Sequence, residues 1–432
     1  MKKYYLAIDI GASSGRHIVG YKQGGEIVLK EVYRFYNGMV DNGDDLIWNV
    51  SALFDEIVKG IALCIQKFGR INSLAIDTWG VDYALIDGDK LISPVNAYRS
   101  GRTKNAIKKV HEIISKRRLY EITGEQFQNF NTIYQLYADK AEGRLEKATD
   151  FLMMPEYFNY LLTGKKVKEY TNATTGALVN VKTKEFDDEI IGALGLNKKL
   201  FPKLHFAGEE VGDLLPEIQA KVGGNIKVKL CASHDTASAF EAVDTEENSV
   251  IISSGTWSLV GVNIKNADIS VRSFESNFAN EGGVGYFRYL KNIMGMWIVN
   301  RCCQELGLDI VTAVEKARKS TYRRTFDVND ESLNAPESML KAIKTLLNES
   351  DLDVGDLFSS IFNSLAISYR KTIKEIEENL DISVPFVYIV GGGAKNRYLN
   401  ELTEEYCKIP VVAMAIEATA FGNIKTQMGE KI

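Results

Sequence analysis

A short apolar segment that ends in a glycine-rich turn occurs twice in this chain, once at the start and once past the middle. Residues 4–10 lead into the turn Gly11-Ala12-Ser13-Ser14-Gly15, and residues 16–21 then resume an extended pattern, which predicts a β-hairpin. Residues 250–262 repeat this pattern around Gly255. Two similar units so far apart predict a chain of two halves, each beginning with the same substructure.

The length agrees with two halves. A chain of 432 residues is too long for one simple core and predicts about two domains. The charged segment 244–248 is the best hinge candidate, so we expect an N-terminal domain over 1–244 and a C-terminal domain over 245–432. Residues from about 95 to 225 read as a helix-rich insertion in the first domain.

Charge and composition exclude several classes of protein. The net charge of −5 argues against non-specific binding of nucleic acid, which needs clustered Lys and Arg. The first apolar run stops at Asp9, which is too early for a signal peptide, and no stretch is long enough to span a bilayer. The five cysteines match neither a zinc site nor a disulfide framework. We therefore expect a cytoplasmic protein without nucleic-acid or membrane partners.

Hydrophobic periodicity predicts an α/β fold. Apolar residues at helical spacing predict helices over 50–68 and 358–380. Short apolar runs predict strands over 71–76, 228–232 and 385–390, each followed by a polar or glycine-rich turn. Catalytic and binding groups often follow strands in this way in α/β proteins.

Two of the glycine-rich turns are candidate phosphate sites. Turns that aim several backbone N–H groups inward bind phosphate oxygens, so Gly11–Gly15 and Gly255-Thr256 can hold one nucleotide from two sides. The alternative for each is an ordinary hairpin turn. Neither turn has the P-loop lysine, and Gly11–Gly15 does not have the dinucleotide-binding spacing.

The third turn, Gly391-Gly392-Gly393, lies between a predicted strand and a predicted helix. Without side chains, this backbone can accept a flat ring, and close helix–strand packing is the alternative. Asp9 ends the first strand and is a candidate magnesium ligand, because Mg²⁺ prefers oxygen. The alternative for Asp9 is a carboxylate that only bonds the adjacent turn.

Asp235 is the strongest candidate for a catalytic group. It follows the strand 228–232 and lies beside His234 and Thr236. Transfer of a phosphoryl group to a hydroxyl needs one carboxylate to orient the acceptor and take its proton. The alternative is that Asp235 only caps the following helix. Residues 77–82 combine polar groups with Trp79, which suits a sugar, unless Trp79 lies in the core.

Taken together, these motifs resemble the FGGY family of carbohydrate kinases over nearly the whole chain. The pieces that carry the resemblance are residues 9–16, 76–82, 170–175, 232–239, 253–259, 280–283 and 290–295. The combination in this order is far more specific than any single glycine turn.

The resemblance implies an actin-like (ribonuclease H-like) fold with two halves around a cleft. It implies ATP-dependent phosphorylation of a ketose at its 1-hydroxyl, with Asp235 as the general base and Mg²⁺ near Asp9. L-Rhamnulose is the first candidate substrate. The implied ATP contacts are Ala12, Ser13, Ser14, Gly15, Arg16, Thr256, Asn300, Gly391, Gly392 and Gly393. The implied sugar contacts are Gly80, His234, Asp235, Thr236 and Asn292.

The sequence also departs from the family pattern. A carboxylate that usually follows Arg99 is missing from Arg99-Ser100-Gly101-Arg102, and Asn300 stands where Gln is usual. The chain stops at Ile432, where relatives continue, so the second domain reads as shortened. L-Fuculose and L-xylulose are therefore alternative substrates. A non-kinase actin-like ATPase or a sugar-responsive regulator is the alternative class. We expect a monomer or a homodimer.

Overall fold

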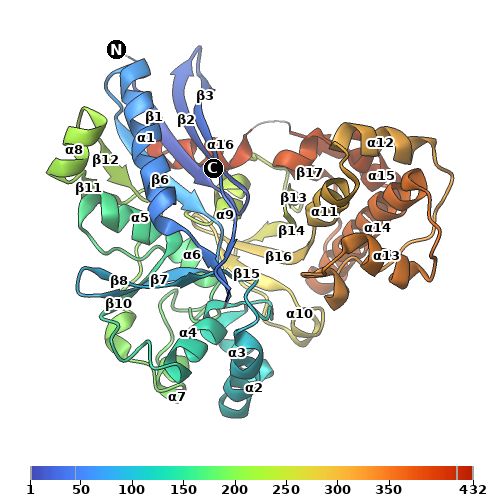
Figure 1. The fold of residues 1–432 in the computed structure, drawn as a ribbon, viewed down its shortest axis with the longest axis horizontal. Coiled ribbons are helices and arrows are strands. Elements are labelled where there is room, and N and C mark those ends of the chain that lie inside the picture. Colours follow the sequence, from blue (N-terminus) through green and yellow to red (C-terminus); the bar gives the residue numbers. More distant parts are fainter. Residues whose placement is uncertain (1, 44, 415–416, 431–432) are drawn as a thin grey trace. The chain divides into compact units, whose positions relative to one another are not determined.

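The structure is a computed structural model that describes residues 2–43, 45–414 and 417–430 (Figure 1). The chain divides into two compact units. Unit 1 consists of Met1–Asp244, Ile264–Tyr289 and Ala418–Ile432, and unit 2 consists of Thr245–Asn263 and Leu290–Glu417. Residues 264–289 and 418–430 thus pack with the N-terminal part of the chain, and the units do not follow a single cut after residue 244.

A six-stranded sheet forms the centre of unit 1, with the strand order β11-β12-β6-β1-β2-β3. Its strands are β1 (Tyr5–Ile10), β2 (Ser14–Gln23), β3 (Glu26–Tyr36), β6 (Ser73–Thr78), β11 (Glu210–Asp213) and β12 (Lys227–Lys229). β1 pairs antiparallel with β2, which confirms the predicted hairpin, and parallel with β6. This register places Asp9 opposite Asp77 at the carboxyl ends of two neighbouring strands.

The sheet of unit 2 repeats this connectivity. Its strands follow the order β16-β14-β13-β17-β18. They are β13 (Val250–Ser254), β14 (Trp257–Ile264), β16 (Phe287–Met294), β17 (Val387–Val390) and β18 (Val411–Ala413). β13 pairs antiparallel with β14 and parallel with β17, as β1 does with β2 and β6. The two halves therefore begin with the same substructure, as the repeated turn predicted.

Two helices pack against the sheet of unit 1. α1 (Val50–Phe68) begins at Asn49, whose side chain accepts a hydrogen bond from the Ala52 N–H at 3.1 Å, and it buries Leu53, Ile57 and Ile61. α16 (Ala418–Met428) contacts β1 and α9 (Asp235–Glu241). A Cβ at Gly422 of α16 would lie 1.8 Å from the Ser238 carbonyl oxygen, so glycine permits the close approach of these two helices.

The predicted insertion is mostly helical and belongs to unit 1. Its helices are α2 (Thr103–Ile113), α3 (Lys116–Thr123), α4 (Thr132–Ala141), α5 (Met154–Thr163), α6 (Tyr170–Thr174), α7 (Asp188–Ala193) and α8 (Pro216–Val222). Two small sheets accompany them: β10 (Asp150–Met153), β7 (Tyr83–Asp87) and β8 (Lys90–Ile92), and β4 (Val40–Asp41), β5 (Leu46–Trp48) and β9 (Val95–Asn96). α10 (Val271–Glu275) and β15 (Ala279–Gly282) also belong to this unit.

Unit 2 is helix-rich outside its sheet. Its helices are α11 (Trp297–Leu306), α12 (Ile310–Lys319), α13 (Met339–Leu347), α14 (Val354–Leu380) and α15 (Arg397–Cys407). α14 begins one turn earlier than predicted, because Asp353 caps it by accepting a hydrogen bond from the Gly355 N–H at 2.7 Å. Among the described residues, no helix combines the length and apolar character needed to cross a membrane.

Candidate active site

Three aspartates of unit 1 lie at or just after the carboxyl ends of three parallel segments. β1 ends at Ile10 and β6 ends at Thr78. The segment after β12 continues beside β6, because the Thr78 N–H donates to the Ser233 carbonyl oxygen at 3.0 Å and Thr78 bridges His234. Parallel strands bring their carboxyl ends to one edge of a sheet, so Asp9, Asp77 and Asp235 lie at the same edge.

Asp235 is the first residue of α9, and its side chain keeps 28% of its exposure. Its Oδ1 accepts a hydrogen bond from the Thr236 hydroxyl at 3.1 Å and lies 3.6 Å from His234 Nε2. Burial raises its pKa, His234 opposes that shift, and the negative charge of Asp9 adds to it. The helix cap is His234 and not Asp235, so the carboxylate does not serve as the N-cap.

The other two carboxylates are more deeply buried. Asp9 forms an ion pair with Arg16 at 2.6 Å, and its side chain is 4% exposed. Asp77 accepts a hydrogen bond from Asn423 Nδ2 at 2.5 Å, while its Oδ1 has no hydrogen-bond partner among the described residues. Burial raises the pKa of Asp77 well above its usual range, and the charge of Asp9 adds to this shift. Of the three, Asp235 is the most accessible, with 28% of its side chain exposed.

The predicted phosphate turn after β1 is a hairpin turn. The Gly11 N–H donates to the Ser14 carbonyl oxygen at 3.0 Å, and Asn37 Nδ2 donates to the Gly11 carbonyl oxygen at 2.8 Å. Ala12, Ser13 and Ser14 form the turn, and Ser13 is exposed. Gly15 lies under the Phe35 ring, so packing requires this glycine. The hairpin form leaves Ser13 open to a ligand.

Gly80 lies in a loop that buried groups hold in place. A Cβ at Gly80 would lie 3.0 Å from the Thr175 side chain, and the Val81 N–H donates to Thr175 Oγ1 at 3.0 Å. Val81 has φ 66°, which is unusual for a β-branched residue and marks a locally strained site. The neighbouring Trp79 is 6% exposed, so it belongs to the core and presents no ring face to a sugar.

The Asp82 carboxylate in this loop accepts hydrogen bonds from several separate segments. Trp48 Nε1 and Trp79 Nε1 donate to its Oδ2 at 2.6 and 3.0 Å, and Gln135 Nε2 donates to its Oδ1 at 2.9 Å. The Tyr98 N–H adds a bond to Oδ2 at 3.1 Å. Burial raises the pKa of Asp82 to about 6, although these four donors oppose the shift. The carboxylate thereby ties the Gly80 loop to the segment that begins at Tyr98.

In unit 2, two candidate nucleotide contacts come together at the β13–β14 turn. The Trp297 N–H donates to the Thr256 carbonyl oxygen at 3.2 Å, so the start of α11 lies on this turn. Asn300 is exposed and is the fourth residue of α11, at the end of its first turn. The turn is again a hairpin, with the Gly255 N–H donating to the Trp257 carbonyl oxygen at 2.8 Å.

The three glycines after β17 have different surroundings. A Cβ at Gly391 would lie 2.9 Å from the Ser254 carbonyl oxygen, and one at Gly393 would lie 1.9 Å from Ser254 Oγ. Nothing lies within 4 Å of a Cβ at Gly392. Close packing therefore explains Gly391 and Gly393, while Gly392 faces open space that a flat ring can occupy.

Two further positions singled out in the sequence are Asn292 and the segment after Arg99. Asn292 lies on β16 in the part assigned to unit 2, and its role as a sugar contact stays a prediction. At the departure after Arg99, the Ser100 hydroxyl donates to Asp45 Oδ2. A carboxylate therefore does lie beside this segment, although it comes from a distant part of the sequence.

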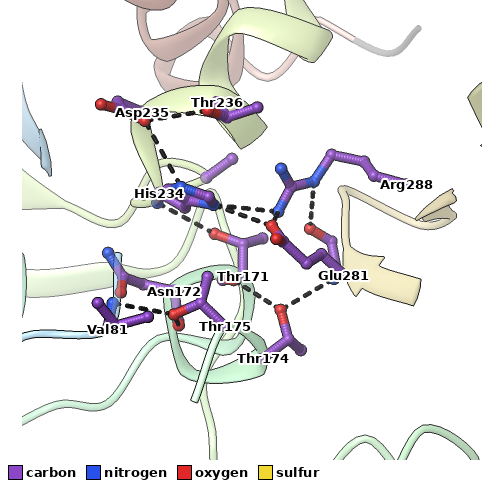
Figure 2. A network of polar contacts seen from close by, with 12 residues as sticks. Val81, Thr171, Asn172, Thr174, Thr175, His234, Asp235, Thr236, Glu281 and Arg288 are labelled. Carbon is purple, nitrogen blue, oxygen red and sulfur yellow. Dashed lines mark hydrogen bonds and ion pairs between the residues drawn. The ribbon is translucent and has the colours of Figure 1, made fainter. Parts of the chain in front are cut away.

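Several residues that support His234 have no role that the sequence pattern predicts. Glu281 and Arg288 contact it directly, and Thr171, Thr174 and Thr175 lie below it (Figure 2). Glu169 Oε2 accepts hydrogen bonds from Thr171 Oγ1 at 2.7 Å and from Ser233 Oγ at 2.5 Å. Residues 170–175 and 280–283 carry part of the family resemblance. Nothing in their spacing along the chain indicates that they meet behind His234.

Asp9 and Gly392 suit the ligands that the sequence predicted for them, which are magnesium and a flat ring. The Asp9 carboxylate is the kind of oxygen ligand that Mg²⁺ prefers, although Arg16 engages one of its oxygens. Among the described residues, no group of three or more His, Cys, Asp or Glu side chains forms a metal cluster. The bare backbone at Gly392 suits a flat ring, because a side chain there would fill the open space.

Comparison with known proteins decides the family. Residues 4–240 match the N-terminal domain of the FGGY family of carbohydrate kinases, and residues 250–429 match its C-terminal domain. The chain belongs to the FGGY family of carbohydrate kinases. It is therefore an ATP-dependent sugar kinase with two domains, and the resemblance predicted from the motifs is confirmed.

Individual relatives agree with this FGGY assignment. A protein of Oceanobacillus iheyensis named rhamnulokinase is 42% identical over 438 residues, which cover 99% of this chain and 93% of that protein. A rhamnulokinase of Halalkalibacterium halodurans is also 42% identical, over 98% of this chain and 93% of its own. The solved gluconate kinase of Lactobacillus acidophilus has a TM-score of 0.81 at 16% identity, covering 100% of this chain and 90% of its own. This likeness shows the shared actin-like fold.

Proposed function

We propose that this FGGY kinase transfers the terminal phosphoryl group of ATP to the 1-hydroxyl of L-rhamnulose, with Asp235 as the general base. The substrate follows from the two relatives named rhamnulokinase, each 42% identical over nearly the full chain. The products are L-rhamnulose 1-phosphate and ADP, and the hydroxyl proton leaves through Asp235.

One observation carries the role of Asp235. Of the three carboxylates at the sheet edge, it has the most exposed side chain, 28% against 4% for Asp9. Its raised pKa makes it a better proton acceptor than an ordinary aspartate. It therefore combines access to a hydroxyl with the basicity that phosphoryl transfer to an alcohol needs.

The neighbours of Asp235 suit a sugar. We assign the ketose to Gly80, His234, Asp235, Thr236 and Asn292. The Thr236 hydroxyl already orients Asp235 Oδ1, and Thr175 fixes the Gly80 loop through the Val81 N–H. Binding the ketose with its 1-hydroxyl toward Asp235 turns the proton transfer into an intramolecular step.

The nucleotide is assigned to residues 12–16, Thr256, Asn300 and the turn 391–393. ATP supplies the phosphoryl group, and magnesium neutralises negative charge on it. The chain contributes backbone N–H groups at its hairpin turns, open space at Gly392, and the Asp9 carboxylate as a ligand for magnesium or its water shell.

A panel of ketoses tests the proposal. We expect ADP release to depend on L-rhamnulose and to be much slower with L-fuculose or L-xylulose, and ³¹P–¹H couplings in the product should place the phosphate on carbon 1. Faster turnover with another ketose would reassign the substrate. Release of ADP that is independent of every ketose would instead favour a non-kinase ATPase.

A further inference from the structure

A buried ion pair lies directly behind His234. Arg288 Nη2 donates to Glu281 Oε2 at 2.7 Å, and the same Glu281 oxygen lies 3.0 Å from His234 Nδ1 (Figure 2). Arg288 is 0% exposed and the Glu281 side chain 7%. Burying both charges of an ion pair costs free energy, so stability alone does not explain why this pair contacts a candidate site residue.

Glu281 is the charged member of a pair of buried carboxyl groups. Burial alone would raise its pKa, but the charge of Arg288 and the hydrogen bonds with His234 and Arg288 lower it to about 2. The neighbouring Glu125 shows the opposite shift, because burial and the charge of Glu281 raise its pKa well above the usual range. Glu281 therefore faces the imidazole as a carboxylate.

The imidazole of His234 lies between two carboxyl groups. Its Nδ1 faces Glu281, and its Nε2 lies 3.6 Å from Asp235 Oδ1. An ionised carboxylate can only accept a hydrogen bond, and its 3.0 Å contact is shorter than the 3.4 Å contact that Arg288 Nη2 makes with the same nitrogen, so a proton on Nδ1 fits the geometry best. In the neutral ring, this leaves the lone pair on Nε2, at the side of Asp235.

The backbone that carries Glu281 is itself held from two sides. The Gly282 N–H donates to Thr174 Oγ1 at 3.0 Å, and Arg288 Nε donates to the Gly282 carbonyl oxygen at 2.9 Å. A Cβ at Gly282 would lie 2.3 Å from the Tyr170 ring, so only glycine fits there. The motif 170–175 thus fixes the peptide next to Glu281.

We propose that Glu281, held in place by Arg288, is a positioning residue that sets the tautomer and orientation of His234, so that Nε2 is presented at Asp235 as an acceptor for a substrate hydroxyl. The role of Nε2 toward the sugar rests on the proposed kinase function. The tautomer itself depends only on the contacts within unit 1.

Two variants separate positioning from folding. Glu281→Gln keeps the size of the side chain and removes its charge, but it leaves the Arg288 guanidinium buried without its anion. Glu281→Gln/Arg288→Met removes both charges together, so no buried charge is left unpaired. Asp150→Asn is the matched control, because Asp150 also pairs at 2.8 Å with a buried cation, Lys168, and makes no hydrogen bond or ion pair with His234 in the described part of the chain.

The first measurement needs no substrate. Long-range ¹H–¹⁵N spectra of protein labelled in histidine resolve the rings of the four histidines, and His234→Asn assigns the signal of His234. We expect neutral His234 in the wild type to be protonated at Nδ1, and both Glu281 variants to show a mixture of tautomers. A wild-type ring protonated at Nε2, or an unchanged tautomer in both variants, overturns the proposal.

The second measurement is kinetic. We expect both Glu281 variants to raise KM for the ketose about tenfold to a hundredfold, while KM for ATP is unchanged, since misplacing a group by about 1 Å can cost about a hundredfold. Asp150→Asn should lower the melting temperature without raising KM for the ketose relative to KM for ATP. Equal loss for both substrates would mean that Glu281 only stabilises the fold. If the wild type phosphorylates no ketose, the proposed function fails, and the tautomer spectrum still decides the role of Glu281.

Discussion

Asn423 of the C-terminal helix α16 donates a hydrogen bond to Asp77 at the end of β6, at 2.5 Å, although 346 positions separate the two residues. The same amide group donates to the Ala75 carbonyl oxygen at 3.2 Å. Both residues are fully buried. The last helix of the chain therefore helps to hold the edge of the sheet that carries the candidate catalytic residues.

Asn423→Ala should lower the free energy of unfolding by about 1–3 kcal/mol, because it leaves a buried carboxyl without its donor. Urea unfolding at neutral pH measures this. Asn225→Ala is the control, since Asn225 donates to Asp213 at 2.9 Å on the exposed surface, and it should cost less. Equal losses of unfolding free energy in the two variants would show that the buried hydrogen bond between Asn423 and Asp77 stabilises the fold no more than an exposed one does.

Asp235→Asn should reduce kcat about 10²- to 10⁴-fold, the usual contribution of a general base, while the ketose and ATP still bind. The amide keeps the size of the side chain but cannot accept the hydroxyl proton. ADP release measures turnover, and calorimetry measures both affinities. Asp87→Asn, at the exposed end of β7, should behave as the wild type. Turnover close to the wild-type rate would remove Asp235 from the mechanism.

Gly392→Val should weaken ATP binding about tenfold or more, equal to about 1.4 kcal/mol, and leave ketose binding unchanged. The added side chain meets no protein atom within 4 Å of its Cβ, so it occupies only the space assigned to the nucleotide. Titration calorimetry with each ligand separates the two effects. Gly192→Val in α7 is the control, because its Cβ would also meet open space. Unchanged ATP affinity would place the nucleotide elsewhere.

Asp82 should make stability depend on pH. Its pKa rises from 3.8 in the unfolded chain to about 6 in the folded one, so between these values the folded state holds the extra proton. Stability from this group therefore falls as pH rises from about 4 to about 6, by about 3 kcal/mol at 1.36 kcal/mol per pKa unit.

Asp82→Asn should flatten that part of the curve, and at neutral pH it should also cost about 1–3 kcal/mol, because the amide nitrogen cannot accept from Trp48, Trp79 or Tyr98. Urea unfolding across the acidic range gives both quantities. Asp213→Asn, an exposed carboxylate on β11, should keep the wild-type slope. Parallel curves for Asp82→Asn and the wild type would show that Asp82 does not titrate in this window.

Local pattern predicted much of the fold. Helical spacing predicted α1 and most of α14, and the glycine turns predicted both hairpins. The pattern around Trp79 leaves two interpretations open, since an aromatic next to polar groups suits either a sugar or a core. The structure places it in the core against Trp48, with ring centroids 4.1 Å apart. Its partner lies on a separate strand, which spacing around Trp79 does not indicate.

By itself, the sequence determined the repeated strand–turn–strand unit, the place of Asp235 directly after a strand, and the FGGY family. Each of these depends on residues close together along the chain. Only the tertiary structure decided that Glu281 faces His234, that Asn423 supports Asp77, and that Gly392 alone of its three glycines is open. Those features arise where distant segments meet, and contacts of that kind leave no periodicity in the sequence.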